Sequence, residues 1–202
     1  MDADVIVVGL GAVGSAAAWQ LARRGARVLG LDRFAPPHDR GSSHGLTRVT
    51  REAVGEGEAY VPLARRSHAL WRELESALAG ELDGPLMTPT GVLYIGPAGR
   101  DAAFVAQTQH VAERHGVPHE VLDAAAVRRR WPQFRMQDDE AAVFELGAGV
   151  VYPERCVGAQ LAMARRAGAV LRGDTPVERL SRTASGLAVH LSLIHISQGI
   201  VR

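Results

Sequence analysis

Residues 5–14 of the chain are VIVVGLGAVG, a short β-branched apolar run followed at once by the pattern G-x-G-x-x-G. The run Val5–Val8 predicts a buried strand of a parallel sheet. Residues 12–24 are rich in alanine, contain no proline and precede a glycine, which predicts a helix. The apolar stretch 26–31 predicts a second strand, so the three elements together predict a βαβ unit with a right-handed crossover.

The three glycines of this pattern have separate roles. Gly9 allows a tight turn, Gly11 lets the backbone approach a pyrophosphate, and Gly14 permits close packing of helix and strand. The helix N-terminus also presents unpaired N–H groups to the anion. Asp32 follows Gly14 by eighteen positions, at the end of the second strand, where a carboxylate accepts hydrogen bonds from ribose hydroxyls. The pattern therefore predicts an adenine dinucleotide site, and it does not separate NAD from FAD.

The composition is that of an ordinary globular protein. Apolar residues make up 47% of the 202 residues and charged residues 22%, which excludes disordered, collagen-like and disulfide-scaffold chains. A net charge of +1 favours neither nucleic acid nor an anionic membrane as a partner, and the opening strand is too short to span a bilayer. The single cysteine, Cys156, excludes an internal disulfide and a cysteine-based metal cluster. We therefore expect a cytoplasmic protein with no metal centre.

The end of the chain differs in composition from the rest. All 23 basic residues are arginine, and isoleucine occurs at positions 6 and 95 and then three times among the last nine positions. We expect residues 192–202 to be an atypical tail that arose from a frameshift, a chimeric sequence or a cloning scar. Chance is the alternative, since short strands favour isoleucine.

Apolar patterns and breaker residues predict alternating helices and strands along the remaining chain. Helices are expected over residues 60–79, 101–115, 124–131 and 153–167, with Asp101 and Asp123 as N-caps of the second and third. Strands are expected over residues 91–95, 141–144, 150–152, 169–171, 177–180 and 187–191. Residues 33–57 show no periodicity, and a loop of that length inside a compact domain is usually functional.

The loop 33–57 contains the second group of candidate residues. It carries PPH at 36–38, GSSHG at 41–45, TRVTR at 47–51 and GEG at 55–57. The guanidinium groups of Arg48 and Arg51 could contact cofactor phosphates, a substrate carboxylate or the electron-rich end of a reduced flavin. The alternative is a solvated basic loop, which the spacing alone slightly favours.

These motifs resemble the monomeric sarcosine oxidase and N-methyltryptophan oxidase family. The similarity extends to about residue 189 and rests on segments 4–32, 36–38, 41–57, 60–64, 70–71, 90–93, 130–132 and 149–156. It implies an α/β fold, in which a Rossmann-type FAD-binding domain carries an inserted, incomplete α+β substrate domain. The implied divisions are residues 1–80 for the first part of the FAD-binding domain, 81–148 for the substrate domain, 149–191 for the return to the FAD-binding domain, and 192–202 for the tail.

The resemblance also implies roles for residues that hold the cofactor. The positions that bind the ADP part of FAD match Gly9, Gly11, Gly14 and Asp32. The segment that passes along the FAD matches Ser42, Ser43 and His44, and a backbone contact to adenine matches Val177.

Other matched residues belong to the reaction centre. Thr47 and Arg48 match residues beside the flavin ring, where the charge of Arg48 stabilises a developing flavin anion and favours reaction with O2. With His44 they form the implied catalytic group. Arg51 matches the arginine that binds the substrate carboxylate, and Glu56 matches an acidic residue that holds this arginine.

The sequence departs from the family pattern at several points. Glu52 and Val54 stand where similar proteins often carry His and Tyr, so the substrate preference is expected to differ. The chain has roughly half a family length and lacks the regions that contain the cysteine of covalent flavin attachment and a lysine near the flavin. Cys156 lies at a different family position and is expected to be a small buried hydrophobe.

From these observations we expect FAD-dependent oxidation of an N-methyl amino acid, of sarcosine or N-methyltryptophan type, with O2 reduced to H2O2. We also expect the chain to be an N-terminal fragment. The expected partners are a small secondary amine and O2, with no nucleic acid and no membrane. Two alternatives stay open: an NAD-dependent dehydrogenase, which the glycine motif and Asp32 also allow, and a non-catalytic fragment that only binds the cofactor.

Overall fold

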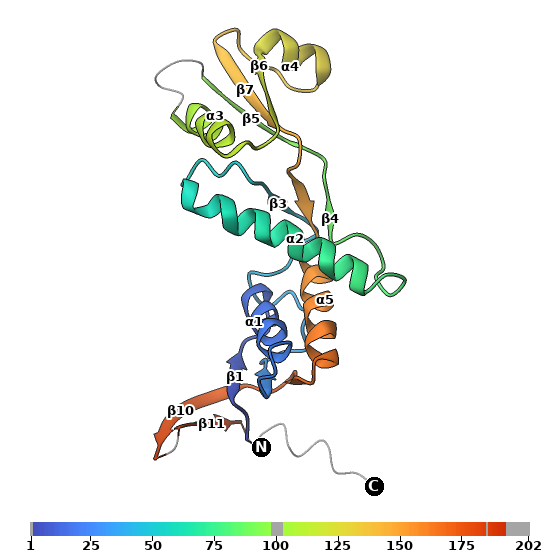
Figure 1. The fold of residues 1–202 in the computed structure, drawn as a ribbon, viewed down its shortest axis with the longest axis vertical. Helices are drawn as coiled ribbons and strands as arrows, with labels where there is room; N and C mark the ends of the chain where they lie inside the picture. Colours follow the sequence, from blue (N-terminus) through green and yellow to red (C-terminus); the bar gives the residue numbers. More distant parts are fainter. Residues whose placement is uncertain (1, 98–102, 185, 193–202) are drawn as a thin grey trace. The chain divides into compact units, whose positions relative to one another are not determined.

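The computed structural model describes residues 2–97, 103–184 and 186–192 (Figure 1). The chain forms two compact units. The first unit contains Met1–Leu46, Leu74–Leu86 and Tyr152–Arg202, and the second contains Thr47–Glu73 and Met87–Val151. Each unit is therefore assembled from segments that lie far apart in the sequence.

A three-stranded parallel sheet forms the centre of the first unit. Its order is β1-β2-β9, with β1 at Val5–Val8, β2 at Val28–Leu31 and β9 at Val170–Arg172. Helix α1 (Ala12–Ala22) connects β1 to β2, and the two strands pair in parallel. The predicted strand–helix–strand unit is therefore confirmed, although the helix ends two residues earlier than expected.

Helix α1 packs against helix α5 (Pro153–Arg166) in the first unit (Figure 1). Trp19 on α1 and Leu161 on α5 are buried in this contact region, and Cys156 on α5 is only 5% exposed, as expected of a small buried hydrophobe. A polar pair joins the two helices, because Ser15 Oγ donates to Gln160 Oε1 at 2.6 Å. Since an unpaired polar group at this buried position would cost free energy, the bond favours one rotation of the two helices.

Two further elements belong to the first unit. Strands β10 (Val177–Thr183) and β11 (Gly186–Leu191) form an antiparallel hairpin. The segment Leu74–Leu86 is fixed at its end by Leu86, whose N–H donates to Glu75 Oε1 at 2.7 Å and whose carbonyl accepts the N–H of Tyr152 at 3.0 Å.

The second unit contains two antiparallel sheets of three strands each. One has the order β3-β8-β4, with β3 at Arg48–Thr50, β8 at Gly149–Val151 and β4 at Met87–Thr88. The other has the order β5-β7-β6, with β5 at Val92–Pro97, β7 at Glu140–Glu145 and β6 at His119–Asp123. Because only residues 146–148 separate β7 from β8, the chain passes directly from one sheet to the other.

Helices cover both faces of the sheet β5-β7-β6. Helix α3 (Ala103–His115) packs on one face, where Val105 meets Val143, and helix α4 (Ala124–Arg130) packs on the other, where Val127 meets Ala142. Neighbouring residues of a strand point to opposite faces, so β7 supplies both cores. Helix α2 (Val61–Ala77) follows a short 3-10 turn, Glu58–Tyr60. Among the described residues, no helix has the length and apolar character needed to cross a membrane.

Most predicted elements are confirmed, and those that the sequence analysis missed are the short strands β3, β4 and β6. β3 lies in the segment 33–57, where Arg48 and Val49 are both exposed and produce no alternating pattern. Asp123 caps α4 as expected, because its Oδ1 accepts the N–H of Ala126 at 2.7 Å. The expected cap Asp101 and residues 193–202 of the expected tail lie outside the described residues, and the expected domain boundaries stay a prediction.

Substitution of Gly14 tests the packing beneath the glycine turn. A Cβ at Gly14 would overlap the backbone oxygen of Gly9, so we expect Gly14→Ala to lower the free energy of unfolding by about 1–3 kcal/mol. The matched control is Gly158→Ala in α5, where a Cβ would meet no atom within 4 Å and alanine favours the helix by about 1 kcal/mol. Urea unfolding measures both, and equal effects of the two substitutions would contradict this packing.

Candidate functional site

A cavity of about 960 Å³ in the first unit lies beyond the carboxyl ends of β1 and β2. Six residues that were expected to bind the cofactor line it: Gly9, Gly11, Asp32, Ser42, Ser43 and Val177. Its volume is in the usual range for cofactor sites, and ligands of open α/β sheets bind at this end of the strands. The structure thus brings Val177, near the end of the chain, together with residues from its first quarter.

The glycine turn forms one wall of this cavity. Gly9 has a φ of +88°, a conformation that favours glycine, and its N–H donates to Leu31 O at 2.8 Å. At the start of α1, the N–H of Ala12 donates to Ser43 Oγ at 3.0 Å. A Cβ at Gly11 would lie only 3.0 Å from the same oxygen, so glycine keeps the serine segment close to the helix N-terminus. The positive end of the helix dipole borders the cavity there, which suits a diphosphate.

Asp32 joins the glycine turn to the end of β2. Its Oδ2 accepts the N–H of Leu10 at 2.7 Å, and its Oδ1 accepts the N–H of Phe34 at 2.9 Å and lies 3.2 Å from His38 Nε2. The residue is 7% exposed. A carboxylate has about four acceptor positions, so these three contacts leave one for a ribose hydroxyl. The carboxylate therefore orders the turn and can still contact a nucleotide.

Val177 reaches the cavity through the chain that follows β9. The N–H of Thr175 donates to Asp32 O at 2.7 Å, which places residues 174–177 beside the end of β2. This segment therefore lines the cavity together with the end of β2. Together the cavity volume, the glycine turn and the buried Asp32 carboxylate fit an adenine dinucleotide.

The sequence analysis assigned no role to Arg33, Phe34, His38 and Arg40, which also line the cavity. The guanidinium carbons of Arg33 and Arg40 lie 5.6 and 5.8 Å from the centre of the Phe34 ring. The available signal was the run PPH at 36–38 with arginines before and after it. That run indicates a turn, but it does not indicate that the turn folds back over the glycine motif.

The other expected site residues lie outside this cavity lining. Gly14 packs beneath the turn, and His44 belongs to the same unit, next to Gly45, whose N–H donates to Glu154 Oε1 at 2.6 Å. Four more belong to the second unit: Thr47, Arg48, Arg51 and Glu56. Within that unit Arg48 is exposed, and its Nη1 donates to Thr47 O at 2.9 Å.

Arg51 lies in a polar and aromatic setting in the second unit. Its guanidinium forms an ion pair with Glu56, and its central carbon lies 5.9 Å from the Tyr94 ring centre and 5.8 Å from the Phe104 ring centre. The backbone N–H of Glu56, together with Arg51, lowers the pKa of the Glu56 carboxyl. Burial, reinforced by the charge of Glu145, raises the pKa of the Tyr94 hydroxyl well above its usual value. Tyr94 therefore keeps its proton and donates to Glu145 Oε2 at 3.2 Å.

The βαβ unit, its glycine turn and the acid after the second strand define a dinucleotide-binding α/β protein of the Rossmann type. The chain belongs to the FAD dependent oxidoreductase family, which matches residues 4–200. The fold class and the family resemblance expected from the sequence are thus confirmed. Family membership also favours FAD over NAD, the alternative that the glycine pattern had left open.

Several known proteins are similar to the chain. The monomeric sarcosine oxidase of Streptomyces avermitilis is 45% identical over 187 residues, which cover 93% of this chain and 47% of that protein. The N-methyl-L-tryptophan oxidase of Salmonella newport is 37% identical over 203 residues, which cover 100% of this chain and 53% of that protein. Among solved structures, the open form of NikD, described as an unusual amino acid oxidase, has a TM-score of 0.78 at 30% identity. This match covers 94% of this chain and 47% of the NikD chain. The chain spans about half the length of the curated relatives it matches.

Asp32→Asn tests the part that this carboxylate plays in cofactor binding. The amide group would turn a donor toward the N–H of Leu10 or Phe34 and remove the charge, so we expect FAD affinity to fall about ten- to hundredfold. The matched control Asp39→Asn changes an 82% exposed side chain of the same loop and is expected to leave the affinity unchanged. Titration followed by flavin fluorescence measures both, and equal affinities of the two variants would rule out this role.

Proposed function

We propose that the protein is a flavin-dependent oxidase of N-methyl amino acids. The observation that carries this proposal is the cavity around the glycine turn and Asp32, in a chain that the FAD dependent oxidoreductase family matches over residues 4–200. The similar proteins named as sarcosine oxidase and N-methyl-L-tryptophan oxidase support the class of substrate. When bound, FAD would take a hydride equivalent from the N-methyl carbon of a neutral secondary amine and pass the electrons to O2, giving H2O2.

The residues of the first unit would bind and orient this cofactor. Gly11 and the N-terminus of α1 would hold the diphosphate, and the free acceptor position of Asp32 would bind a ribose hydroxyl. Ser42 and Ser43 would lie along the cofactor, and the backbone at Val177 would contact the adenine. All these residues line the same cavity, which supports one shared ligand.

The residues of the second unit would act on the substrate. Arg51 would bind the substrate carboxylate through two parallel hydrogen bonds, and the carboxylate would replace Glu56 as its partner. The proposed catalytic residues are Thr47 and Arg48 of this unit and His44 of the first unit, and the charge of Arg48 would stabilise negative charge on the flavin ring. The proposed domain division gives residues 1–80 and 149–191 to the FAD-binding domain and residues 81–148 to the substrate domain, and it differs from the compact units in residues 47–73, which lie in the second unit. A cytoplasmic location without a nucleic-acid partner stays a prediction from composition.

The proposal is tested on the purified protein after incubation with FAD. We expect visible flavin absorbance that remains with the protein on gel filtration, and release of H2O2 with N-methylglycine or N-methyltryptophan under air. Bound flavin without H2O2 would favour a non-catalytic, cofactor-binding role. Absence of bound flavin together with reduction of NAD by a substrate would favour the dehydrogenase instead.

Arg51→Gln tests the carboxylate-binding role separately. Loss of a charge-assisted pair is expected to raise KM for N-methylglycine about tenfold or more, with a smaller change in kcat. Arg129→Gln, on the exposed end of α4, is the matched control and is expected to leave KM unchanged. An unchanged KM in Arg51→Gln would show that Arg51 does not bind the carboxylate.

A further inference from the structure

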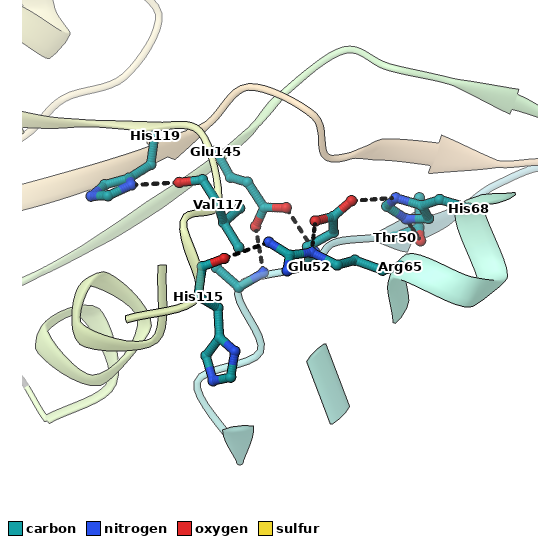
Figure 2. Close-up of polar contacts among 9 residues, drawn as sticks. Thr50, Glu52, Arg65, His68, His115, Val117, His119 and Glu145 are labelled. Atoms are coloured by element: carbon teal, nitrogen blue, oxygen red, sulfur yellow. Dashed lines mark hydrogen bonds and ion pairs between the residues drawn. The ribbon is translucent and has the colours of Figure 1, made fainter. Parts of the chain in front are cut away.

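A buried imidazole of the second unit contacts both sequence neighbours of Arg51 (Figure 2). His68, on α2, is 1% exposed. Its Nε2 lies 2.8 Å from Thr50 Oγ1, and its Nδ1 lies 3.3 Å from Glu52 Oε1. Because a carboxylate only accepts, Nδ1 donates to Glu52. Each ring nitrogen of His68 thus has a partner, one on either side of Arg51 in the sequence.

Glu52 is held by a second side chain as well. Arg65 Nε donates to Glu52 Oε2 at 2.9 Å, and Arg65 Nη2 donates to the carbonyl of His115 at 2.6 Å (Figure 2). Both carboxylate oxygens of Glu52 thus have protein partners. These contacts of Glu52 therefore fix the chain beside Arg51.

The backbone that follows Arg51 is held by a buried carboxylate. Glu145, at the end of β7, is 0% exposed. Its Oε1 accepts the N–H of Glu52 at 2.6 Å (Figure 2). Its Oε2 accepts the N–H of Ala53 at 3.1 Å, and Tyr94 donates a third hydrogen bond. Two successive backbone groups, left without a strand partner after β3, are thereby satisfied by one side chain.

These contacts determine where the Arg51 side chain can lie. Thr50 and Glu52 both contact His68, whereas the Arg51 side chain between them contacts a separate set of residues. Its guanidinium meets Tyr94, Phe104 and Glu56. Tyr94 connects the surroundings of Arg51 to those of Glu145, because it contacts Arg51 through its ring and Glu145 through its hydroxyl.

We propose that His68 and Glu145 are positioning residues that hold Arg51 in the orientation in which it binds the substrate carboxylate. The proposal rests on the proposed function of Arg51, and neither residue touches the substrate itself. A guanidinium that is already oriented loses less conformational freedom on binding, so its affinity for a carboxylate is higher. His68→Gln and Glu145→Gln should therefore weaken the binding of a carboxylate much more than that of its neutral amide.

The test follows the Arg51 Nε–H signal in ¹⁵N NMR spectra of the FAD-loaded protein, identified by its loss in Arg51→Lys. N-methylglycine and N-methylglycinamide are titrated separately. In the unsubstituted protein the signal is expected to shift with the carboxylate and not with the amide. His68→Gln and Glu145→Gln are each expected to weaken carboxylate binding at least fivefold, and the amide should still shift nothing.

Matched controls separate positioning from a general loss of structure. His110→Gln changes an exposed histidine of α3, and Glu120→Gln changes a carboxylate of β6 that pairs with Arg130 on the surface. Both are expected to leave the titration unchanged. Should Glu145→Gln fail to fold, as thermal unfolding would show, Tyr94→Phe removes one hydrogen bond of the same carboxylate and must weaken carboxylate binding in its place.

The outcomes distinguish the inference from the proposed function. A shift in the unsubstituted protein that His68→Gln and Glu145→Gln leave unchanged overturns the positioning role, while the carboxylate-binding role of Arg51 stands. A signal that does not respond to N-methylglycine overturns both. In turnover measurements, His68→Gln should raise KM for N-methylglycine in the unsubstituted background and have no further effect in Arg51→Gln, because two residues that act through one contact are not additive.

Discussion

The hydrogen bonds from the backbone of Leu10 and Phe34 to the Asp32 carboxylate are the constraint on which the proposed nucleotide site depends. The glycine turn has few side chains of its own, so its conformation must be held from outside. Asp32 supplies this support from the end of β2, and Ser43 supplies a further contact at the start of α1. Without these bonds the turn would be disordered, and its N–H groups would not point consistently into the cavity. The positive end of the helix dipole would then have no fixed anion site beside it.

The second unit also contains a buried carboxylate that holds a loop through backbone hydrogen bonds. Glu145, like Asp32, is a buried carboxylate whose oxygens accept two backbone N–H groups of a functional loop. Burial of a carboxylate is costly unless hydrogen bonds replace the lost water, and in both units the loop backbone provides them. The stability of each carboxylate and the order of each loop therefore depend on one another. In the oxidase that we propose, one loop would hold the cofactor and the other would present Arg51 to the substrate.

The parts of the molecule that sequence reasoning predicted are those that depend on local signals. The β1–α1–β2 unit follows from one apolar run and three glycines, and Asp123 caps its helix as its position indicates. The contacts of Glu145 and His68 could not be predicted in this way, because Glu145 lies 92 and 93 residues from the groups that it binds. Short strands such as β3 were missed because pairing with β8, rather than an alternating pattern, makes them strands. Asp32 also holds residues 34–38 beside the end of β2, because its Oδ1 accepts the N–H of Phe34, two positions away, and contacts His38 Nε2, six positions away.

The most direct measurement is an NMR titration of the backbone amides with ADP and, separately, with adenosine. If the glycine turn binds the diphosphate, ADP will shift the amides of Gly9, Gly11 and Ala12 as well as that of Val177, and adenosine will shift Val177 while leaving the turn unchanged. If ADP does not shift the amide signals of the turn, or shifts only amide signals of the second unit, the central claim that this turn is the dinucleotide site is contradicted.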